Sequence, residues 1–319
     1  MPLRAPYRLI DKKLREGSAV PFLGAGVNIR SPGAEGVGTQ LPTGGQLSRQ
    51  LAELVSFPSD DERDVEDLSK VASYFVETSA RSVLRQELRA VFDIDSEPGP
   101  IHHYLASIDT PLLIVTTNYD DNMERALQRA GRPFDLVVHP TDRKDYDASV
   151  FWWRAGASAP EKPVAPNKLL IDLSQTTVVY KMHGTMHRAD AQWDSYVVTE
   201  DDYVEFLSRM AGQSAVPSQF IRHFRSRHFL FLGYGLRDWN LRVLLRSLAM
   251  APVPEPNAPQ PVTPTPPDAG SEERVKSWAI QYKPSMIERE LWNARDVRIF
   301  DESIDDFTTA ILGTPTPAP

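Results

Sequence analysis

The 319-residue chain contains no cysteine. This absence excludes disulfides, cysteine-ligated zinc, iron–sulfur clusters and thiol nucleophiles, and it is typical of proteins in a reducing compartment. No apolar run approaches the ~20 residues that a membrane-spanning helix needs. Residues 1–13 carry charge without an apolar core, unlike a secretory signal. We therefore expect a cytoplasmic protein that does not interact with membranes.

Basic residues are scarce relative to acidic ones. The chain has 35 Lys and Arg against 43 Asp and Glu, which gives a net charge of -8. A general nucleic-acid binder needs a basic surface, so we expect no direct nucleic-acid binding. No Gly-Lys dipeptide occurs, which excludes a P-loop nucleoside triphosphatase. With 41% hydrophobic and 24% charged residues, the composition is that of an ordinary globular protein.

Proline is unevenly distributed. Of the 27 prolines, a large group lies within residues 251–270 and a smaller one at the end of the chain. Such segments favour extended, polyproline-like conformations. We therefore predict a Pro-rich loop at 251–270, with no role that the sequence assigns, and a loose tail at 314–319.

Short apolar runs bounded by turn residues predict buried strands. The runs are apolar throughout instead of alternating, which favours a parallel sheet covered on both faces. Helical leucine patterns lie between them, around residues 47–55, 84–91 and 241–248. Strands that alternate with helices predict an α/β fold with a doubly wound, mostly parallel, Rossmann-like sheet. The predicted strands are 19–23, 112–116, 136–138, 178–182, 229–232, 278–282 and 297–300.

We expect residues 1–319 to form a single domain with insertions. A mostly helical insertion covers about residues 40–110, between the first two predicted strands. A second insertion, at about 141–175, is irregular and includes Phe151-Trp152-Trp153. Both are compatible with covering a cleft or with packing as satellite elements.

Polar and glycine-rich residues follow four of the predicted strands. They are Gly24-Ala25-Gly26 with Asn28, then Asn118, His183, and Gly233-Tyr234-Gly235. The carboxyl ends of parallel strands meet at one edge of a sheet, and ligands bind where the strand order reverses. The sequence therefore predicts that these distant segments converge on one crevice.

Each of these features also has a simpler interpretation. The Gly24–Gly26 turn suits a pyrophosphate cradle, but it lacks the third glycine of the dehydrogenase fingerprint, because Ile29 stands there. Asn118 could cap the helix that follows it, and a histidine after a strand is often structural. Their joint occurrence at strand ends favours a dinucleotide site.

His183 and His187 are four residues apart, as in some zinc sites. The residue after His183 is Gly184, where a metalloprotease helix has glutamate, and no third ligand is apparent. We therefore predict no metal site.

The motifs at these strand ends resemble those of the sirtuin-like (silent information regulator) family. The likeness covers nearly the whole chain. Deacylating sirtuins carry a four-cysteine zinc module, which is absent here, and a glutamine where this chain has Thr117. Both differences favour the prokaryotic anti-phage branch that hydrolyses NAD. The matching segments are VPFLGAG at 20–26, LPT at 41–43, TTNYD at 116–120, KMHG at 181–184, FLGYGLRD at 231–238 and VRIF at 297–300.

The resemblance implies an NAD hydrolase that cleaves its substrate NAD to nicotinamide and ADP-ribose, as an effector of bacterial anti-phage abortive infection. Because an unregulated NAD hydrolase would kill its host, we also expect the activity to be gated by a homo-oligomer, a regulatory partner or a fused sensor domain. Two alternatives stay open: a non-catalytic sensor of NAD or ADP-ribose, and an NAD-dependent protein deacylase or ADP-ribosyl transferase.

The resemblance also implies roles for single residues. Asn118 and His183 are the expected catalytic residues, and Asp120 is expected to contact the nicotinamide carboxamide. Expected NAD-binding residues are Gly24, Ala25, Gly26, Asn28, Thr117, Asp120, Gly233, Tyr234 and Gly235.

Overall fold

A computed structural model of the chain describes residues 4–29, 40–141, 149–161, 164–211, 215–235 and 277–313. The predicted helix around 241–248, the Pro-rich loop at 251–270 and the tail at 314–319 lie outside these ranges.

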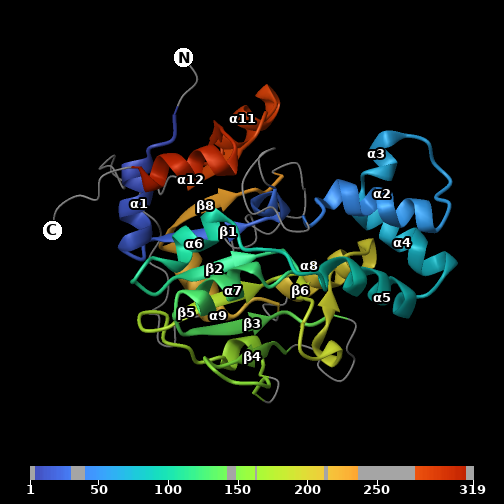
Figure 1. The fold of residues 1–319 in the computed structure, drawn as a ribbon, viewed down its shortest axis with the longest axis horizontal. Coiled ribbons are helices and arrows are strands. Elements are labelled where there is room, and N and C mark those ends of the chain that lie inside the picture. The colour runs from blue at the N-terminus through green and yellow to red at the C-terminus, as the bar shows by residue number, and fades with distance from the viewer. Residues whose placement is uncertain are drawn as a thin grey trace, which may run out of the picture.

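Within the described ranges, the chain forms an eight-stranded sheet (Figure 1). Its strand order is β10-β9-β8-β1-β2-β5-β3-β4, and every pair except β3–β4 is parallel. The fold is therefore the predicted mostly parallel, Rossmann-like α/β fold, and all the predicted strands are present. The strands are β1 Ala19–Leu23, β2 Leu113–Thr116, β3 Phe134–Val138, β4 Phe151–Trp153, β5 Thr177–Lys181, β8 His228–Leu232, β9 Ser277–Gln281 and β10 Val297–Asp301.

Strand β4 corrects the expectation that the stretch 141–175 is irregular. It pairs antiparallel with β3, and Val150 forms a bridge with Val164. Three residues are too few to show a period, so the sequence pattern missed this strand. The Trp152 indole N–H donates to the buried carboxylate of Asp135, 2.7 Å away, which fixes the strand on its neighbour.

Helices cover both faces of the sheet. Strand β1 is buried along its whole length because Ala19 and Leu23 pack into one core, and Val20 and Phe22 pack into the other. Strands that are covered on both faces are mostly apolar, which explains the continuous runs in the sequence. One face is covered by α1 Tyr7–Arg15, α6 Pro100–Ala106, α7 Asn122–Arg129 and α12 Ile304–Leu312, and the other by α9 Ser218–Arg225 and α11 Met286–Asn293.

Residues 44–92, between β1 and β2, form a helical lobe beside the sheet (Figure 1). Thr43 caps the first helix of the lobe: its side chain accepts the backbone N–H of Gln46, and the Gln46 side chain accepts the backbone N–H of Thr43. The lobe core also contains Tyr119, Met186 and Tyr196, which come from the segments that follow β2 and β5. The lobe therefore packs against the carboxyl ends of the strands. Its helices are α2 Gly44–Leu54, α3 Glu62–Val65, α4 Leu68–Thr78 and α5 Arg81–Phe92.

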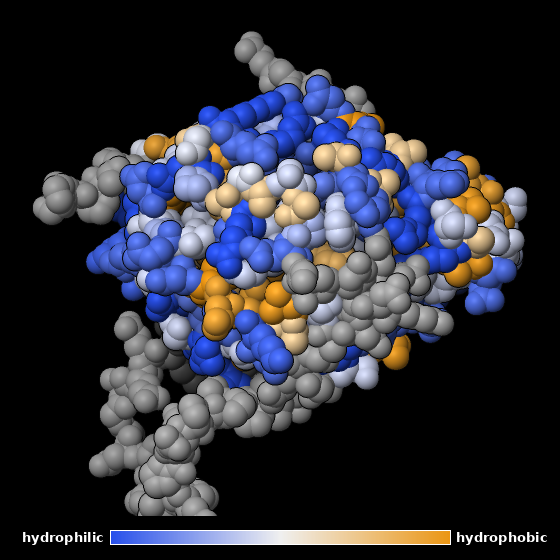
Figure 2. All heavy atoms as spheres, turned by 90° about the horizontal axis from the view of Figure 1, so that it is seen from below, coloured by the Kyte–Doolittle hydropathy of each residue, from blue (hydrophilic) through white to orange (hydrophobic). Residues whose placement is uncertain are grey.

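Two further elements lie between the lobe and the sheet (Figure 1). The first is a short hairpin of β6 Gly184–Thr185 and β7 Ser195–Tyr196, and the second is α8 Glu200–Ala211. Figure 2 shows mostly hydrophilic residues on the face nearest β4, with hydrophobic residues in small groups. No helix in the described ranges combines the length and apolar character needed to cross a membrane.

Candidate functional site

The strand order of the sheet reverses between β1 and β8. From β1 the chain continues to β2 on one side, and it later returns to β8 on the other side. Leu23 of β1 lies opposite both Thr116 of β2 and Leu232 of β8, and Thr116 lies opposite Lys181 of β5. Four strand ends are thus level with one another around the switch point, which is where doubly wound sheets bind ligands.

The predicted site residues follow directly from this register. Ala25, Asn118, His183 and Tyr234 each lie two residues beyond one of the paired positions. They therefore lie at one level along the same edge of the sheet. The predicted convergence of these segments is present, although the role of each residue stays a prediction.

The two glycine-rich turns pack backbone against backbone. The N–H of Gly26 donates to the carbonyl of Gly233 at 2.8 Å. Gly233 has φ +62°, and a Cβ on it would lie 2.3 Å from the backbone nitrogen of Val27. A Cβ on Gly26 would lie 2.7 Å from the carbonyl oxygen of Gly233. The contact between the turns therefore requires glycine at both positions. This requirement holds whether or not a pyrophosphate binds at the turn.

Asn118 joins the end of β2 to the turn after β1. Its side-chain amide donates to the carbonyl of Gly24 at 3.1 Å, and its backbone N–H donates to Thr116 Oγ1 at 3.0 Å. The backbone N–H of Thr117 donates to the carbonyl of Leu23 at 3.2 Å. Helix α7 begins at Asn122 after Asp121, so Asn118 does not cap it. The amide of Asn118 is fixed and 9% exposed.

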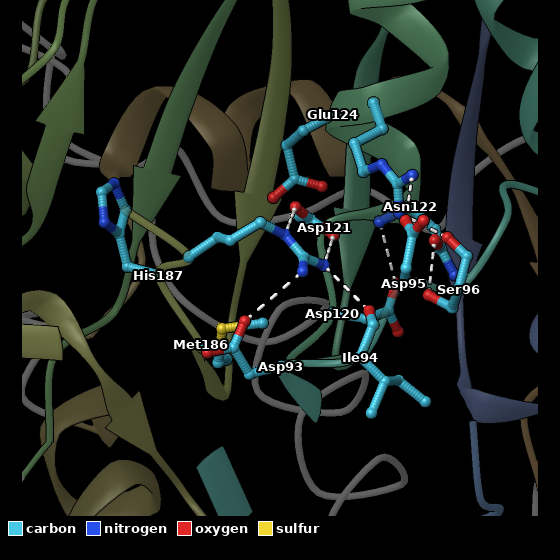
Figure 3. A network of polar contacts seen from close by, with 12 residues as sticks. Asp93, Ile94, Asp95, Ser96, Asp120, Asp121, Asn122, Glu124, Met186 and His187 are labelled. Carbon is cyan, nitrogen blue, oxygen red and sulfur yellow. Dashed lines mark hydrogen bonds and ion pairs between the residues drawn. The ribbon is translucent and has the colours of Figure 1, made fainter. Parts of the chain in front are cut away.

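Asp120 belongs to a buried polar network. Its carboxylate accepts bonds from the side-chain amide of Asn28 at 2.8 Å and from the backbone N–H of Asn122 at 3.0 Å. The Asn122 side-chain amide donates to Asn28 Oδ1 at 3.0 Å. Its Oδ1 accepts the hydroxyl of Ser96, also at 3.0 Å (Figure 3). Burial raises the pKa of Asp120, and the nearby charge of Lys181 acts in the opposite direction. Two of the predicted NAD-binding residues, Asn28 and Asp120, are thus direct partners.

His183 lies under α8. Its ring makes edge contacts with Tyr203 and Phe206, at centroid distances of 5.3 and 5.8 Å, and the residue is 7% exposed. Burial lowers the pKa of His183 to about 4, although the carboxylate of Asp202 acts to raise it. The imidazole is therefore neutral near pH 7, and neutral imidazole is the form that accepts a proton.

Lys181 positions the turn between Asn118 and Asp120, a role that the sequence did not reveal. Its side chain is fully buried and its Nζ donates to the backbone carbonyls of Tyr119 and Asp120. It also pairs with Glu124 Oε1 at 2.9 Å. The sequence does place a lysine at the end of an apolar strand. A buried ammonium needs carbonyl or carboxylate partners, so this position could have indicated a structural role for Lys181.

Arginines on α5 tie the helical lobe to the segment that follows His183. Arg81 pairs with Asp202 at 2.8 Å, and Arg89 pairs with Asp194 at 2.8 Å. Between them, Arg85 donates to the backbone carbonyl of Asp194 at 2.9 Å. These residues are spaced four apart and share one helix face. The spacing was visible in the sequence, but their partners more than a hundred residues away were not.

His187 does not join His183. Its ring stacks on Trp153 at 5.4 Å, and its Nδ1 accepts the backbone N–H of Asp190 at 3.2 Å. Across the described ranges, no group of three or more potential metal ligands occurs.

The doubly wound sheet and the polar residues at its switch point define a Rossmann-like α/β protein of the kind that binds nucleotides at the strand ends. Residues 112–300 match the model of the SIR2-like domain. The chain belongs to this family, which confirms the resemblance seen in the sequence motifs.

Curated relatives carry more specific names. The chain is 29% identical over 240 residues to the NAD(+) hydrolase ThsA of Acinetobacter baumannii (strain 532279), and 26% identical over 237 residues to that of Cytobacillus dafuensis. It is 23% identical over 237 residues to the defense-associated sirtuin 2 of Bacillus subtilis. The matches cover 74%, 73% and 74% of this chain but only 40%, 38% and 20% of the respective relatives. The chain thus spans less than half the length of each relative.

Proposed function

We propose that the protein hydrolyses NAD to nicotinamide and ADP-ribose. Membership of the SIR2-like family and the similarity to two NAD(+) hydrolases support this activity. The observation that carries the proposal is the strand register, which aligns Asn118 with His183 beside the switch point of the sheet.

The reaction breaks the bond between the nicotinamide nitrogen and the ribose. Nicotinamide leaves with the bonding electron pair and is neutral, because its ring is cationic in NAD. The leaving group needs no acid, so the barrier lies in forming an oxocarbenium-like sugar, as in glycoside hydrolysis. A water then forms the new bond to the same carbon and loses one proton.

The proposed catalytic roles follow from the chemistry of the two side chains. An amide does not titrate near neutrality, so Asn118 orients the water or the ribose hydroxyls by hydrogen bonds. Neutral His183 accepts the proton. Both residues are nearly buried, so NAD must displace part of their cover. For His183, that cover includes Tyr203 and Phe206 of α8.

The proposed binding residues line the same edge. Asp120 contacts the nicotinamide carboxamide. The turn at 24–26, with Asn28 and Thr117, contacts the pyrophosphate, and the turn at 233–235 approaches the adenosine ribose. No metal is required by these roles.

We also propose that the protein acts in anti-phage defence in the cytoplasm, since a defense-associated sirtuin is among its relatives. Uncontrolled NAD hydrolysis would kill the host cell. The activity is therefore gated, either by oligomerisation or by a partner or sensor domain.

Incubation of the protein with NAD over a series of protein concentrations tests the proposal. Chromatography should detect equimolar nicotinamide and ADP-ribose, with a specific rate that rises with protein concentration if oligomerisation gates the site. Tight NAD binding in calorimetry without product would support a sensor instead. Turnover only in the presence of an acetylated peptide would support a deacylase.

A further inference from the structure

The two expected catalytic residues lie just beyond the last paired positions of their strands. The register of β2 and β5 ends at Thr116 and Lys181, and the N–H of Met182 donates to the carbonyl of Thr116 at 2.9 Å. Asn118 and His183 follow on segments that then separate, one leading to α7 and the other into the β6–β7 hairpin. Contacts outside the sheet must therefore fix their relative position.

Tyr119 connects these two segments through its side chain. It follows Asn118 directly, and its hydroxyl donates to the backbone carbonyl of Val197 at 2.6 Å. Val197 follows the β6–β7 hairpin, and its N–H donates to the backbone carbonyl of His183 at 2.8 Å. The peptide groups of Val197 thus bond to the residue after Asn118 on one side and to His183 on the other.

This link is shielded from water, and its donor keeps its proton. Tyr119 is 7% exposed and Val197 is fully buried. Burial raises the pKa of the Tyr119 hydroxyl, and the nearby carboxylate of Asp202 acts in the same direction. The hydroxyl is therefore a donor at neutral pH. A hydrogen bond in a buried environment is electrostatically stronger than the same bond in water.

The rest of Tyr119 is held in place as well. Its ring makes edge contacts with Phe92 of α5 and with Tyr196 of β7, at centroid distances of 5.3 and 5.1 Å. Its backbone carbonyl accepts the N–H of Met186 at 2.9 Å. Because the ring and the backbone are both fixed, the hydroxyl is a rigid anchor for Val197.

Val197 also leads into helix α8, whose side chains cover the ring of His183. The carboxylate of Asp202 on α8 accepts the backbone N–H groups of Val198 and Thr199, both at 2.9 Å. These bonds connect α8 to the residues next to Val197. A shift of Val197 would therefore move both the backbone of His183 and the helix that contacts its ring.

We propose that Tyr119 is a positioning residue for NAD hydrolysis, because its hydroxyl, acting through Val197, sets the position of His183 relative to Asn118. The inference rests on the proposed function. The group that Asn118 orients must lie within hydrogen-bonding reach of the His183 imidazole, and a misplacement of about 1 Å can cost about 10²-fold in rate. Tyr119 itself contacts no reacting atom.

Two tyrosine variants test this role. Tyr119→Phe removes the hydroxyl and keeps the ring. Tyr104→Phe is the matched control, because the hydroxyl of this buried tyrosine on α6 donates to Asp11 at 2.8 Å. Both variants should lose stability towards urea, since each loses a buried hydrogen bond.

Only Tyr119→Phe should lose turnover. Its kcat per folded molecule should fall about 10- to 100-fold with little change in the KM for NAD, whereas Tyr104→Phe should keep the wild-type kcat. A kcat near the wild-type value in folded Tyr119→Phe, or the same decrease in both variants, would overturn the proposal.

NMR of protein with labelled histidine tests the link without catalysis. The ring signal of His183, identified by its absence from His183→Gln, should shift in Tyr119→Phe and stay unchanged in Tyr104→Phe. If the wild type releases no nicotinamide, the proposed hydrolysis fails, and the ring signal alone decides whether Tyr119 positions His183. An unchanged His183 signal in Tyr119→Phe would refute the link in either case.

Discussion

The side-chain amide of Asn118 donates a hydrogen bond to the backbone carbonyl of Gly24, 3.1 Å away. This bond connects the ends of β2 and β1 beside the point where the strand order reverses. The orientation of the amide is therefore set before any substrate binds, which is the property that a water-positioning group needs.

Replacing Asn118 by alanine should abolish most NAD hydrolysis. Loss of a positioning group costs about 10²- to 10⁴-fold in rate, whereas one lost hydrogen bond costs about 1 kcal/mol of stability. Nicotinamide release, measured beside thermal unfolding, separates the two effects. Asn293→Ala, at an exposed position on α11, serves as the control. A folded Asn118→Ala protein with near-normal turnover would refute the site assignment.

His183 should give an unusual dependence of the rate on pH. Because burial lowers its pKa to about 4, the imidazole is neutral throughout the neutral range. Nicotinamide release should therefore stay level from about pH 8 to pH 5.5 and decline only below that, whereas an unperturbed histidine would lose half of its base form near pH 6.5. His183→Gln should be inactive at every pH. A rate that halves near pH 6.5 in the wild type would contradict the buried environment.

Buried histidines should also make the protein less stable in mild acid. The pKa of His139 is about 3 and that of His183 about 4, below the 6.5 of the unfolded chain. The unfolded state therefore binds more protons between these values, so stability is present above pH 6.5 and is lost as the pH falls towards 4. Each histidine contributes about 2 kcal/mol to the loss at pH 5.

Urea unfolding at pH 7 and pH 5 measures this loss. The groups that face His183 include Asp202, Tyr203 and, through Phe206, His139 itself. His139→Gln should reduce the difference between the two pH values by about 2 kcal/mol. His103→Gln, at an exposed position on α6, should leave it unchanged. The same difference in all three proteins would show that the histidines are not buried as described.

The strands were the most predictable part of the fold. Continuous apolar runs are unusual outside parallel sheets covered on both faces, so the run at 19–23 predicted both the strand and its surroundings. The convergence of Asn118 and His183 could also be predicted from the sequence, because the carboxyl ends of parallel strands meet at one edge of a sheet. Strand β4 could not be predicted, since three residues show no period.

The partners of individual side chains could not be predicted from the sequence. The pairs Lys181–Glu124 and Arg81–Asp202 depend on how the helices pack on the sheet, not on any local pattern. The role of the glycines in the two turns could not be predicted either, for a different reason. A phosphate cradle and a tight contact between two turns require the same residue type, and the direct packing of Gly233 on Gly26 depends on the tertiary structure.

Gly233→Ala should destabilise the protein strongly. The residue has φ +62°, and its Cβ would lie 2.3 Å from a backbone nitrogen and 2.5 Å from a backbone carbon. Backbone atoms cannot move aside cheaply, so we expect a loss of about 3 kcal/mol or more of unfolding free energy. Gly235→Ala, in the same loop with no atom within 4 Å of the added carbon, should stay within about 1 kcal/mol of the wild type. Equal stability of the two variants in urea would contradict the described contact.

Lys181→Met should leave the carboxylate of Glu124 buried without its cation. Breaking one side of such a pair costs about 3–5 kcal/mol, whereas replacing both partners by apolar residues is often neutral. The double variant Lys181→Met/Glu124→Leu should therefore recover much of the stability that the single variant loses. It should not recover NAD hydrolysis, because the carbonyls of Tyr119 and Asp120 still lack their donor and the turn beside Asn118 is no longer held. Unfolding in urea and nicotinamide release, measured on both variants, separate the two roles of the lysine. A double variant that regains both stability and turnover would mean that Lys181 only neutralises Glu124 and does not position the turn.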